Sequence, residues 1–433
     1  MLFTLILLVT TGLLIGKFSL RRETPMYPVL PTSVDIIVVG SGVAGVVSAL
    51  TAAEKGVDVF YIDLGQPDIG GFPAFNPAFW AAETIYHQQA EITYTVADMA
   101  QNVFVRGEEE GKLELIRRVS EESAAALTWL EQTVGVEFTQ LVAPDVNPGL
   151  HQPQWDDPEK FLLPQLTKAL KTNVLWYDRN LTPLELIPSP RGVAGMVVSN
   201  AAGQTRQIYA RAVILADGGY ASNPEMLRVL AGVTGTLPRP GGGHQGLGLR
   251  LAMAFSAETQ WLERAAVIPV FLPAGRRVTQ MFFPGAIVIG ATGEVVSLGD
   301  NLIDTIRDEG GRLFIVREAG NTDADPNFTR IDDLRTLATG LGIELEQLSE
   351  MTATITPPYD VAVLGLTALT PGGLAIDEQF RVLRQEAAIE GLYAAGEVTA
   401  GLHGSRSIID LYFAESVIGG RIAGQEAAAW ALR

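Results

Sequence analysis

The sequence predicts an α/β fold that is built on a parallel sheet and preceded by a membrane helix. Three observations lead to this prediction. A strand, a glycine turn, a helix and a second strand follow one another between Val34 and Gly65, later apolar strands also end in glycine turns, and the first residues are strongly apolar. Glycine turns at strand ends also point toward function, because a ligand can approach the backbone closely there.

The first unit begins with Asp35 to Val39, an apolar run that suits a strand buried on both faces of a parallel sheet. Gly40, Gly42 and Gly45 follow it with the Gly-x-Gly-x-x-Gly spacing. In this motif the first glycine permits a tight turn, the second lets the backbone approach a diphosphate, and the third lets the helix pack near the strand. The helix predicted from about Ala44 to Lys55 would hold the diphosphate at its N-terminus, where unpaired N–H groups favour negative charge.

The second strand of the unit, Val57 to Ile62, ends at Asp63. Asp63 stands roughly 20 residues after the glycines, where a carboxylate accepts hydrogen bonds from the ribose of adenosine. A carboxylate at this place disfavours a ribose phosphate, so the unit is predicted to be a Rossmann-like dinucleotide site that does not select NADP. The residues predicted to contact the adenosine diphosphate are Gly40, Ser41, Gly42, Ala44, Gly45, Asp63 and Leu64.

The composition limits the possible chemistry and partners. The 433 residues suffice for two or three domains, and a net charge of −18 disfavours binding to nucleic acid. The chain has no cysteine, which excludes disulfides, thiolate nucleophiles and cysteine-ligated iron–sulfur or zinc sites. Redox chemistry must therefore come from a bound organic cofactor, and no metal site is predicted.

The N-terminal segment is predicted to be a transmembrane anchor. Residues 2–16 carry no charge, and apolar residues resume after Lys17, whose long side chain can reach the membrane interface. Residues 1–22 are therefore assigned to the anchor, with residues 2–20 inside the lipid bilayer. An atypical signal peptide is the alternative.

The charges around the anchor predict its orientation. Lys17, Arg21 and Arg22 follow the apolar run, whereas a cleaved signal peptide carries its positive charges before that run. Positive charges on the C-terminal side predict a single-pass anchor with the folded body on the cytoplasmic side. Residues 23–33, which contain three prolines, form the predicted linker.

Two later strands repeat the pattern of an apolar strand followed by a glycine turn. Val213 to Ala216 precede Asp217-Gly218-Gly219, and Leu392 to Ala395 precede Gly396 and Glu397. In an open parallel sheet such turns meet at the carboxyl edge of the strands, which is where ligands bind. We therefore expect these turns to lie beside the first glycine motif.

The order of these turns resembles the flavoprotein family of fumarate reductase, succinate dehydrogenase and 3-ketosteroid dehydrogenase. The resemblance covers roughly residues 34–424. Its most specific segments are the meander and strand of Asn180–Gly219, GGLAID at Gly372–Asp377, GLYAAGEVTAGLHG at Gly391–Gly404 and GRIAG at Gly420–Gly424. The segment AAET at Ala81–Thr84 is similar to the family segment that passes toward the flavin ring.

The resemblance implies a glutathione-reductase-type FAD-binding domain with an inserted α+β capping domain. The FAD-binding domain would comprise residues 34–242 and 360–433, and residues 243–359 would close over the flavin and form the substrate cleft. The flavin would be bound noncovalently, because no histidine follows Gly70 as in covalently flavinylated members. The further residues that the resemblance places at FAD are Gly70, Gly71, Phe72, Ala216, Asp217, Gly218, Gly396, Glu397, Ile408 and Ile409.

The substrate-binding positions of the dicarboxylate reductases in this family are occupied by other residues here. Where the family has histidines and arginines, this chain has Ile268, Phe283, Ile303 and Leu369, and Ser407 replaces the arginine of the C-terminal signature beside Arg406. Aliphatic and aromatic side chains cannot form a bidentate clamp for a carboxylate. Fumarate and succinate are therefore not the expected substrates.

Three residues are predicted to serve catalysis. His244 lies in a glycine turn near the predicted cleft and can transfer a proton, with a structural role as the alternative. Arg406 can bind a substrate carbonyl or enolate, with a surface ion pair as the alternative. Tyr412 can donate to a carbonyl oxygen, although it does not stand where ketosteroid-type members have their tyrosines. His403 matches a family histidine that is usually structural.

Two functions fit the sequence. The first is a membrane-anchored FAD-dependent oxidoreductase that acts on a carbon–carbon bond of an apolar substrate and passes electrons to a quinone or a redox protein. The second is a catalytically weak, flavoprotein-like structural subunit of a membrane complex.

Overall fold

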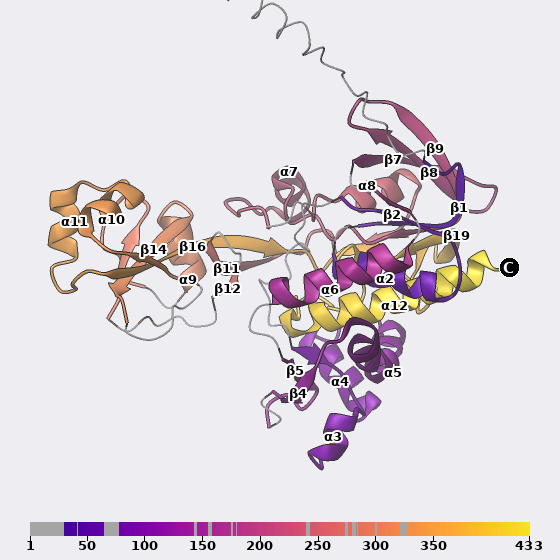
Figure 1. Ribbon diagram of the computed structural model, residues 1–433, viewed down its shortest axis with the longest axis horizontal. Helices are drawn as coiled ribbons and strands as arrows, with labels where there is room; N and C mark the ends of the chain where they lie inside the picture. Colours follow the sequence, from indigo (N-terminus) through magenta and orange to yellow (C-terminus); the bar gives the residue numbers. More distant parts are fainter. Residues whose placement is uncertain are drawn as a thin grey trace, which may run out of the picture. The chain divides into compact units, whose positions relative to one another are not determined.

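A mostly parallel sheet carries the predicted glycine turns in the computed structural model (Figure 1). Its strands run in the order β19-β9-β1-β2-β6, and each neighbouring pair is parallel. Because β19, β9 and β1 are adjacent, the turns after them lie next to one another at one edge, as expected. The strands are β1 (Ser33–Val39), β2 (Val59–Ile62), β6 (Trp176–Asp178), β9 (Thr205–Leu215) and β19 (Ala387–Ala394), with β18 (Arg381–Arg384) antiparallel to β19.

The structure describes residues 30–40, 42–64, 78–142, 145–154, 158–174, 176–178, 180–239, 243–272, 276–278, 283, 285–298, 301–320 and 327–433. Residues Ser33–Arg433 form one compact unit, and of the preceding unit only residues 30–32 are described. The anchor predicted at 1–22, most of the linker at 23–33, and the predicted FAD contacts Ser41, Gly70, Gly71 and Phe72 lie outside the described residues. Within the described ranges, no helix is long and apolar enough to cross a membrane.

Helices α2 (Val43–Glu54) and α12 (Tyr412–Ala431) pack side by side against the parallel sheet (Figure 1). Two glycines of α12 allow this close approach. A Cβ atom on Gly420 would lie 2.7 Å from the carbonyl oxygen of Ala44, and one on Gly424 would lie 2.5 Å from that of Ser48. The GRIAG segment at the end of the family resemblance is therefore the surface on which the nucleotide-binding helix rests.

The three glycines of the first motif differ in how strictly they are required. A Cβ on Gly40 would lie 2.3 Å from the carbonyl oxygen of Ala216, so the end of β9 excludes any side chain there. A Cβ on Gly45 would lie 3.5 Å from the Cα of Gly40 and 3.6 Å from the Cβ of Ala216, which are ordinary contacts. The expectation that Gly45 is needed for helix–strand packing was wrong in this respect, because the helix leaves room for a methyl group.

Other elements surround the parallel sheet. The predicted meander is confirmed as an antiparallel run of β7 (Leu181–Pro188), β8 (Val193–Asn200) and β9. A small sheet of β3 (Phe79–Trp80), β4 (Phe138–Leu141) and β5 (Leu150–Pro153) lies among helices. These helices are α3 (Ile85–Gln89), α4 (Val96–Arg106) and α5 (Leu113–Trp129), whereas α6 (Pro158–Asn173) packs against α2.

A second, mostly antiparallel sheet forms the inserted region. Its strands run in the order β12-β11-β16-β14-β13, and β15 also pairs with β16. The elements are β11 (Ala266–Leu272), β12 (Arg276–Arg277), β13 (Ile287–Gly290), β14 (Arg312–Glu318), β15 (Thr329–Ile331), β16 (Tyr359–Leu369), α9 (Leu302–Asp308), α10 (Leu334–Leu341) and α11 (Leu345–Met351).

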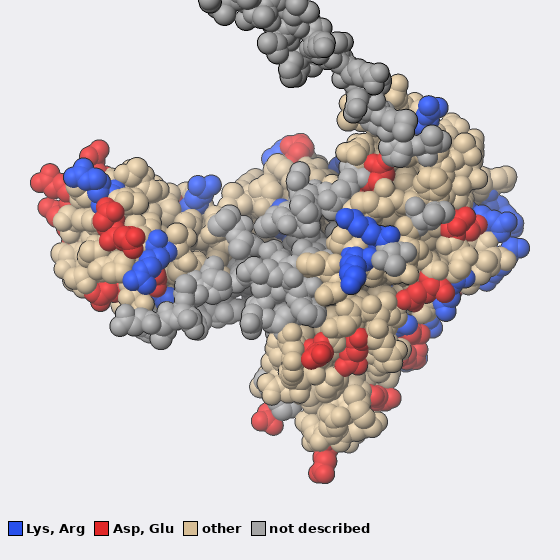
Figure 2. Space-filling model, viewed as in Figure 1, with Lys and Arg blue, Asp and Glu red and all other residues tan. Residues whose placement is uncertain are grey.

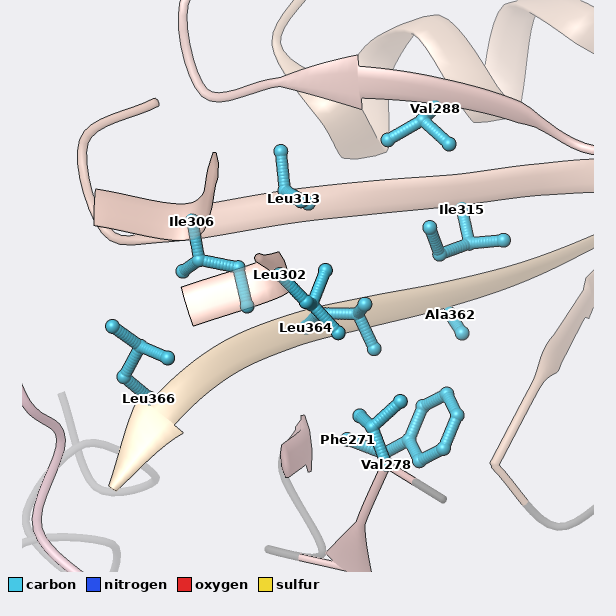
Figure 3. Close-up of a cluster of buried hydrophobic side chains, with 10 residues drawn as sticks. All are labelled: Phe271, Val278, Val288, Leu302, Ile306, Leu313, Ile315, Ala362, Leu364 and Leu366. Carbon is cyan, nitrogen blue, oxygen red and sulfur yellow. The ribbon is translucent and has the colours of Figure 1, made fainter. Parts of the chain in front are cut away.

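Alternation along the strands of this sheet produces two cores. Leu313 and Ile315 of β14 face α9, and together with Leu364 they belong to the buried cluster in Figure 3. Val316, one residue further, belongs to a second cluster with side chains of α10 and α11. Helices therefore cover both faces of the sheet, and the period of two in the strands decides which side chain goes to which face.

The sequence of this region predicts a hairpin that turns at Ala291 to Gly293 and a helical stretch from Ile331 to Leu348 that breaks at Gly340 to Gly342. Residues 284–298 contain a hairpin in which the N–H of Gly290 donates to the carbonyl oxygen of Glu294 at 2.9 Å. The helical stretch is present as α10 and α11 with a break at Gly342, whose φ is 71°, but Ile331 itself ends strand β15. The domain borders at 242/243 and 359/360 stay predictions, but β16 pairs within the second sheet over its whole length, so that sheet extends to Leu369.

On the face drawn in Figure 2, the described acidic residues are scattered and form no single patch. Their Asp and Glu side chains lie over the regions of α3 to α5 and of α10 and α11, and Lys and Arg side chains lie between them. A mixed surface of this kind favours solubility.

Candidate active site

The first glycine turn leads directly into an uncapped helix N-terminus. Gly42 is the N-cap of α2, no side chain caps the helix, and its first turn holds no acidic residue. A Cβ on Gly42 would meet no described atom within 4 Å, so the backbone here borders open space. N–H groups in such a position bind anions, which fits the diphosphate of a dinucleotide.

Asp63 lies at the carboxyl end of β2, and its side chain is buried. Its Oδ2 accepts a hydrogen bond of 2.7 Å from the hydroxyl of Tyr177 on the neighbouring strand β6. Leu64 follows at the same strand end, and Ala44 at the start of α2 lies within contact distance of the Gly396 turn. The predicted adenosine contacts that are described thus lie along one edge of the sheet.

Asp217, in the turn after β9, caps the N-terminal end of helix α8 (Leu247–Ala254). Asp217 is buried, and its Oδ2 accepts a hydrogen bond of 2.8 Å from the N–H of Gly248 in the first turn of α8. Burial raises the pKa of the Asp217 carboxyl to about 6, although the N–H groups of Gly248 and Leu247 act in the opposite direction. The Asp217 carboxylate therefore contacts α8 in the structure. A contact between Asp217 and FAD stays a prediction.

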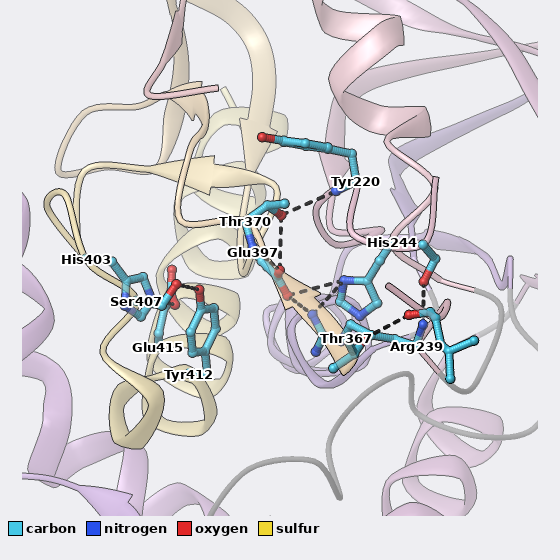
Figure 4. Close-up of polar contacts among 12 residues, drawn as sticks. Tyr220, Arg239, His244, Thr367, Thr370, Glu397, His403, Ser407, Tyr412 and Glu415 are labelled. Carbon is cyan, nitrogen blue, oxygen red and sulfur yellow. Dashed lines mark hydrogen bonds and ion pairs between the residues drawn. The ribbon is translucent and has the colours of Figure 1, made fainter. Parts of the chain in front are cut away.

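Glu397 is the centre of a buried polar cluster (Figure 4). Its Oε2 forms an ion pair with the guanidinium of Arg239 and lies 3.2 Å from Nδ1 of His244. Its Oε1 accepts hydrogen bonds from the N–H and the hydroxyl of Thr370, at 3.0 and 3.1 Å. These four residues come from three segments that are far apart in the sequence, and we call them the Glu397 cluster.

The Glu397 cluster depends on the glycines of the turn after β9. A Cβ on Gly218 would lie 2.5 Å from Nδ1 of His244, and one on Gly219 would lie 2.0 Å from the hydroxyl oxygen of Thr370. Gly218 also has a φ of 84°, a conformation that side chains disfavour. Side chains of the Glu397 cluster thus lie against this turn, and the approach of a ligand to its backbone stays a prediction.

The charges of the cluster keep Glu397 ionised. Burial would raise the pKa of its carboxyl, but the charge of Arg239 and the contacts of His244 and Thr370 outweigh burial and hold that pKa well below its usual range. A buried carboxylate between two cationic or donor groups is stable in the charged form. The carboxylate can therefore accept hydrogen bonds and orient a neighbouring imidazole at every ordinary pH.

His244 combines burial with an unusual backbone conformation. Its φ is 61°, in the left-handed region, and its N–H donates to the carbonyl oxygen of Asp217 at 3.2 Å. Nδ1 lies 3.2 Å from the Glu397 carboxylate and 3.3 Å from Nη1 of Arg239. The carboxylate favours a proton on Nδ1, whereas the guanidinium, which can only donate, favours a lone pair there. A carboxylate-oriented imidazole in a strained turn is the arrangement that proton-transfer residues use.

Tyr412 begins α12 and lies in an apolar environment. It packs with Ile268 and Leu369 in one buried cluster, and its ring stacks on that of His403 with centroids 4.1 Å apart. Its hydroxyl lies 3.3 Å from the hydroxyl of Ser407. Burial and, to a lesser extent, the charge of Glu397 raise the pKa of the phenol well above its ordinary value, so it remains a hydrogen-bond donor.

Arg406 lies apart from these buried groups. Its side chain is 72% exposed and its Nη1 lies 3.5 Å from a carboxylate oxygen of Glu108, which matches the surface alternative. His403 is buried and its Nε2 lies 2.7 Å from Glu415, as a structural histidine would. The N–H of Ile408 donates to Nδ1 of His403, and Ile409 packs against the apolar cluster of Tyr412. His244 thus contacts the Glu397 carboxylate and Tyr412 is influenced by its charge, whereas Arg406 is at the surface.

Sequence reasoning missed Arg239. It belongs to no motif, and the only signal was an arginine placed just before the run of glycines that ends at His244. In the fold it becomes a buried cation because Leu237 is tied to the second sheet, where its N–H donates to the carbonyl oxygen of Leu366 at 2.7 Å.

The apolar residues at the family's substrate-binding positions are also explained, since Phe283 and Ile303 pack against the core of the second sheet.

Comparison with known proteins identifies the family. The family model described as the FAD binding domain matches residues 35–408, so the chain belongs to the FAD binding domain family. Its relatives within this family include reductases. A vinyl phenol reductase of Lactiplantibacillus plantarum is 29% identical over 52% of this chain, although the match spans only 46% of that relative. The fumarate reductase of Schizosaccharomyces pombe is 24% identical over 92% of this chain and 90% of its own.

A solved structure shows the same fold. The open conformation of a flavocytochrome c3 fumarate reductase has a TM-score of 0.75 and 22% identity, and the likeness covers 93% of this chain and 79% of that one. FAD is the cofactor that the family and the fold indicate. The residues present fit its adenosine diphosphate half, because the start of α2 at Gly42 is uncapped and borders open space while Asp63 stands at the next strand end.

Proposed function

We propose that the protein is an FAD-dependent oxidoreductase that acts on a carbon–carbon bond of an apolar substrate rather than a dicarboxylate. The observation that carries this proposal is the apolar wall at Tyr412. Ile268 and Leu369, which stand where the resemblance places substrate-binding histidines, pack directly against this tyrosine. Apolar side chains at these positions would favour a hydrophobic substrate over a dicarboxylate.

The Glu397 cluster supplies the polar groups in this proposal. FAD, when bound, supplies hydride transfer. Because Nδ1 of His244 is engaged by Glu397 and Arg239, Nε2 is the atom through which His244 would take or give a proton. Tyr412, kept protonated by burial, would donate to a carbonyl oxygen of the substrate. A carbonyl next to the reacting bond would then gain electrostatic support as charge develops on it.

The electron acceptor and the membrane association belong to the same proposal. Because the chain has no cysteine, its own residues offer no iron–sulfur relay, and a quinone or a separate redox protein would exchange electrons with the flavin. Residues 2–20 would anchor the chain in the bilayer with the body on the cytoplasmic side. An anchor would bring both an apolar substrate and a quinone within reach, and it leaves room for partner subunits in a membrane complex.

One observation favours the second candidate, a catalytically weak structural subunit. Both oxygens of Glu397, which the resemblance assigns to the ribityl hydroxyls, already have partners in Arg239, His244 and Thr370. A chain that had lost flavin chemistry could keep such a cluster for stability alone. The two candidates make opposite predictions for the visible spectrum of the purified protein.

The test is substrate-dependent change of the flavin spectrum without air. The purified full chain should carry noncovalent flavin that denaturation releases, and an apolar enone or a saturated ketone should change its spectrum, whereas fumarate and succinate should not. His244→Gln should slow the reaction by about 10²-fold or more, and Arg228→Gln, which alters an exposed ion pair, should not. Absence of flavin would support the structural subunit, and bound flavin that no apolar substrate changes would contradict the proposed activity.

A further inference from the structure

The contact between Tyr177 and Asp63 has a consequence for how FAD is held. Asp63 is the acidic residue predicted to bind the adenosine ribose, and an aspartate side chain can rotate between several orientations. The Tyr177 hydroxyl donates to Oδ2 of Asp63 at 2.7 Å, the ordinary length of a hydrogen bond from a hydroxyl to a carboxylate. Oδ2 of Asp63 is thereby held toward β6, which restricts the orientation of the whole carboxylate.

Tyr177 is itself well supported. Its ring stacks on that of Tyr61, with centroids 5.7 Å apart and an angle of 9° between the planes. Strand β6 pairs in register with β2, so that Ile62 lies opposite Asp178. The N–H of Asp63 also donates to the carbonyl oxygen of Asp178 at 2.9 Å. The backbone and side chain of Asp63 are therefore both oriented by residues of β6.

We propose that Tyr177 is a positioning residue that orients the Asp63 carboxylate toward a ribose hydroxyl of the adenosine half of FAD. This inference rests on the proposed function and adds a residue that the glycine motif does not contain. Because Tyr177 acts through Asp63, its effect is confined to ligands that carry the ribose hydroxyl. A residue that only supported the sheet would affect all adenine nucleotides equally.

The experiment compares ADP with 2′-deoxy-ADP on the purified full chain freed of flavin, by calorimetry. The wild-type protein should bind ADP more tightly, because Asp63 accepts a bond from the ribose hydroxyl. Tyr177→Phe removes only the phenolic oxygen, and we expect it to weaken ADP about fivefold to tenfold while leaving 2′-deoxy-ADP unchanged. FAD should weaken by a similar factor.

A matched variant at the other end of the site is Thr370→Val, which removes the hydroxyl bond to Glu397 and should weaken FAD but not ADP. Equal loss of ADP and 2′-deoxy-ADP in Tyr177→Phe would show a merely structural role and overturn the inference, as would unchanged ADP binding. A wild-type chain that binds neither nucleotide would instead contradict the FAD site itself. Normal nucleotide discrimination without substrate turnover would leave the role of Tyr177 intact and reject only the proposed activity.

Discussion

The two ends of the predicted FAD site are assembled in different ways. The adenosine end is largely local, because Gly40, Gly42 and Asp63 belong to one βαβ unit, which Tyr177 joins from β6. The flavin end combines Arg239 and His244 with Glu397 and with Thr370 at the end of the second sheet (Figure 4). It therefore depends on tertiary structure that the motif at the first end does not need.

The difference also concerns charge. The adenosine end offers helix N–H groups to an anion and holds its acidic residue with a neutral hydroxyl. The flavin end encloses a full ion pair, which is costly to desolvate and is retained only when its geometry satisfies both partners. We infer that the adenosine end tolerates substitutions that the flavin end does not, and the following predictions test that contrast.

The largest effect is expected from breaking the buried ion pair. Arg239→Gln leaves the Glu397 carboxylate buried without its strongest partner, which should lower the free energy of unfolding by about 3–5 kcal/mol. Urea unfolding at neutral pH measures this change. Arg228→Gln, at an exposed pair with Glu225, is the control and should cost less than about 1 kcal/mol. Similar effects of the two variants would refute the contrast between buried and surface charge.

A second prediction uses the two buried carboxyls of the flavin end, whose pKa values move in opposite directions. Asp217 has its pKa raised from 3.8 to about 6, so between these values the folded state binds more protons than the unfolded state. Stability contributed by Asp217 should therefore fall as pH rises from about 4 to 6, by on the order of 2–3 kcal/mol. Asp217→Asn should remove that slope and raise stability at pH 7.

Glu397 should give the opposite pH dependence of stability to Asp217 in the same measurement. Its pKa is lowered in the folded state, so its contribution is present above the unfolded pKa near 4.5 and is lost as pH falls below it. Glu397→Gln should therefore flatten the acid side of the stability curve. A wild-type curve without the opposing slopes would contradict the described environments of both carboxyls.

The smallest difference in the free energy of unfolding is expected between alanine variants of two glycines at the adenosine end. Gly40→Ala places a methyl group 2.3 Å from the carbonyl oxygen of Ala216 and should lower the free energy of unfolding by about 1–3 kcal/mol. Gly45→Ala has ordinary contacts and sits inside α2, where alanine is the better helix former, so it should be neutral or stabilising by up to about 1 kcal/mol. Thermal unfolding of both variants checks the pair, and equal losses would restore the expected packing role of Gly45.

Sequence reasoning succeeded where the signal is local. The βαβ unit, the meander before β9 and the break at Gly342 each follow from residues close together in the chain. It failed for Arg239, because an arginine in a loop shows its role only when distant segments bring a carboxylate to it. The predicted domain border at 359/360 stays a prediction, and it falls at the start of β16 because an apolar strand such as Tyr359–Leu369 does not reveal which sheet it will join.

The contact between α2 and α12 has a consequence for how the protein is made. Val43 and Tyr412 begin two helices that depend on each other's surface, yet the ribosome delivers them at opposite stages of synthesis. Until β19 and α12 have been synthesised, one apolar side of the βαβ unit stays exposed. Exposed apolar surface of this kind is what chaperones bind in chains whose contacts join distant segments. Truncation of α12 would then expose the dinucleotide half of the molecule to aggregation rather than merely shorten it.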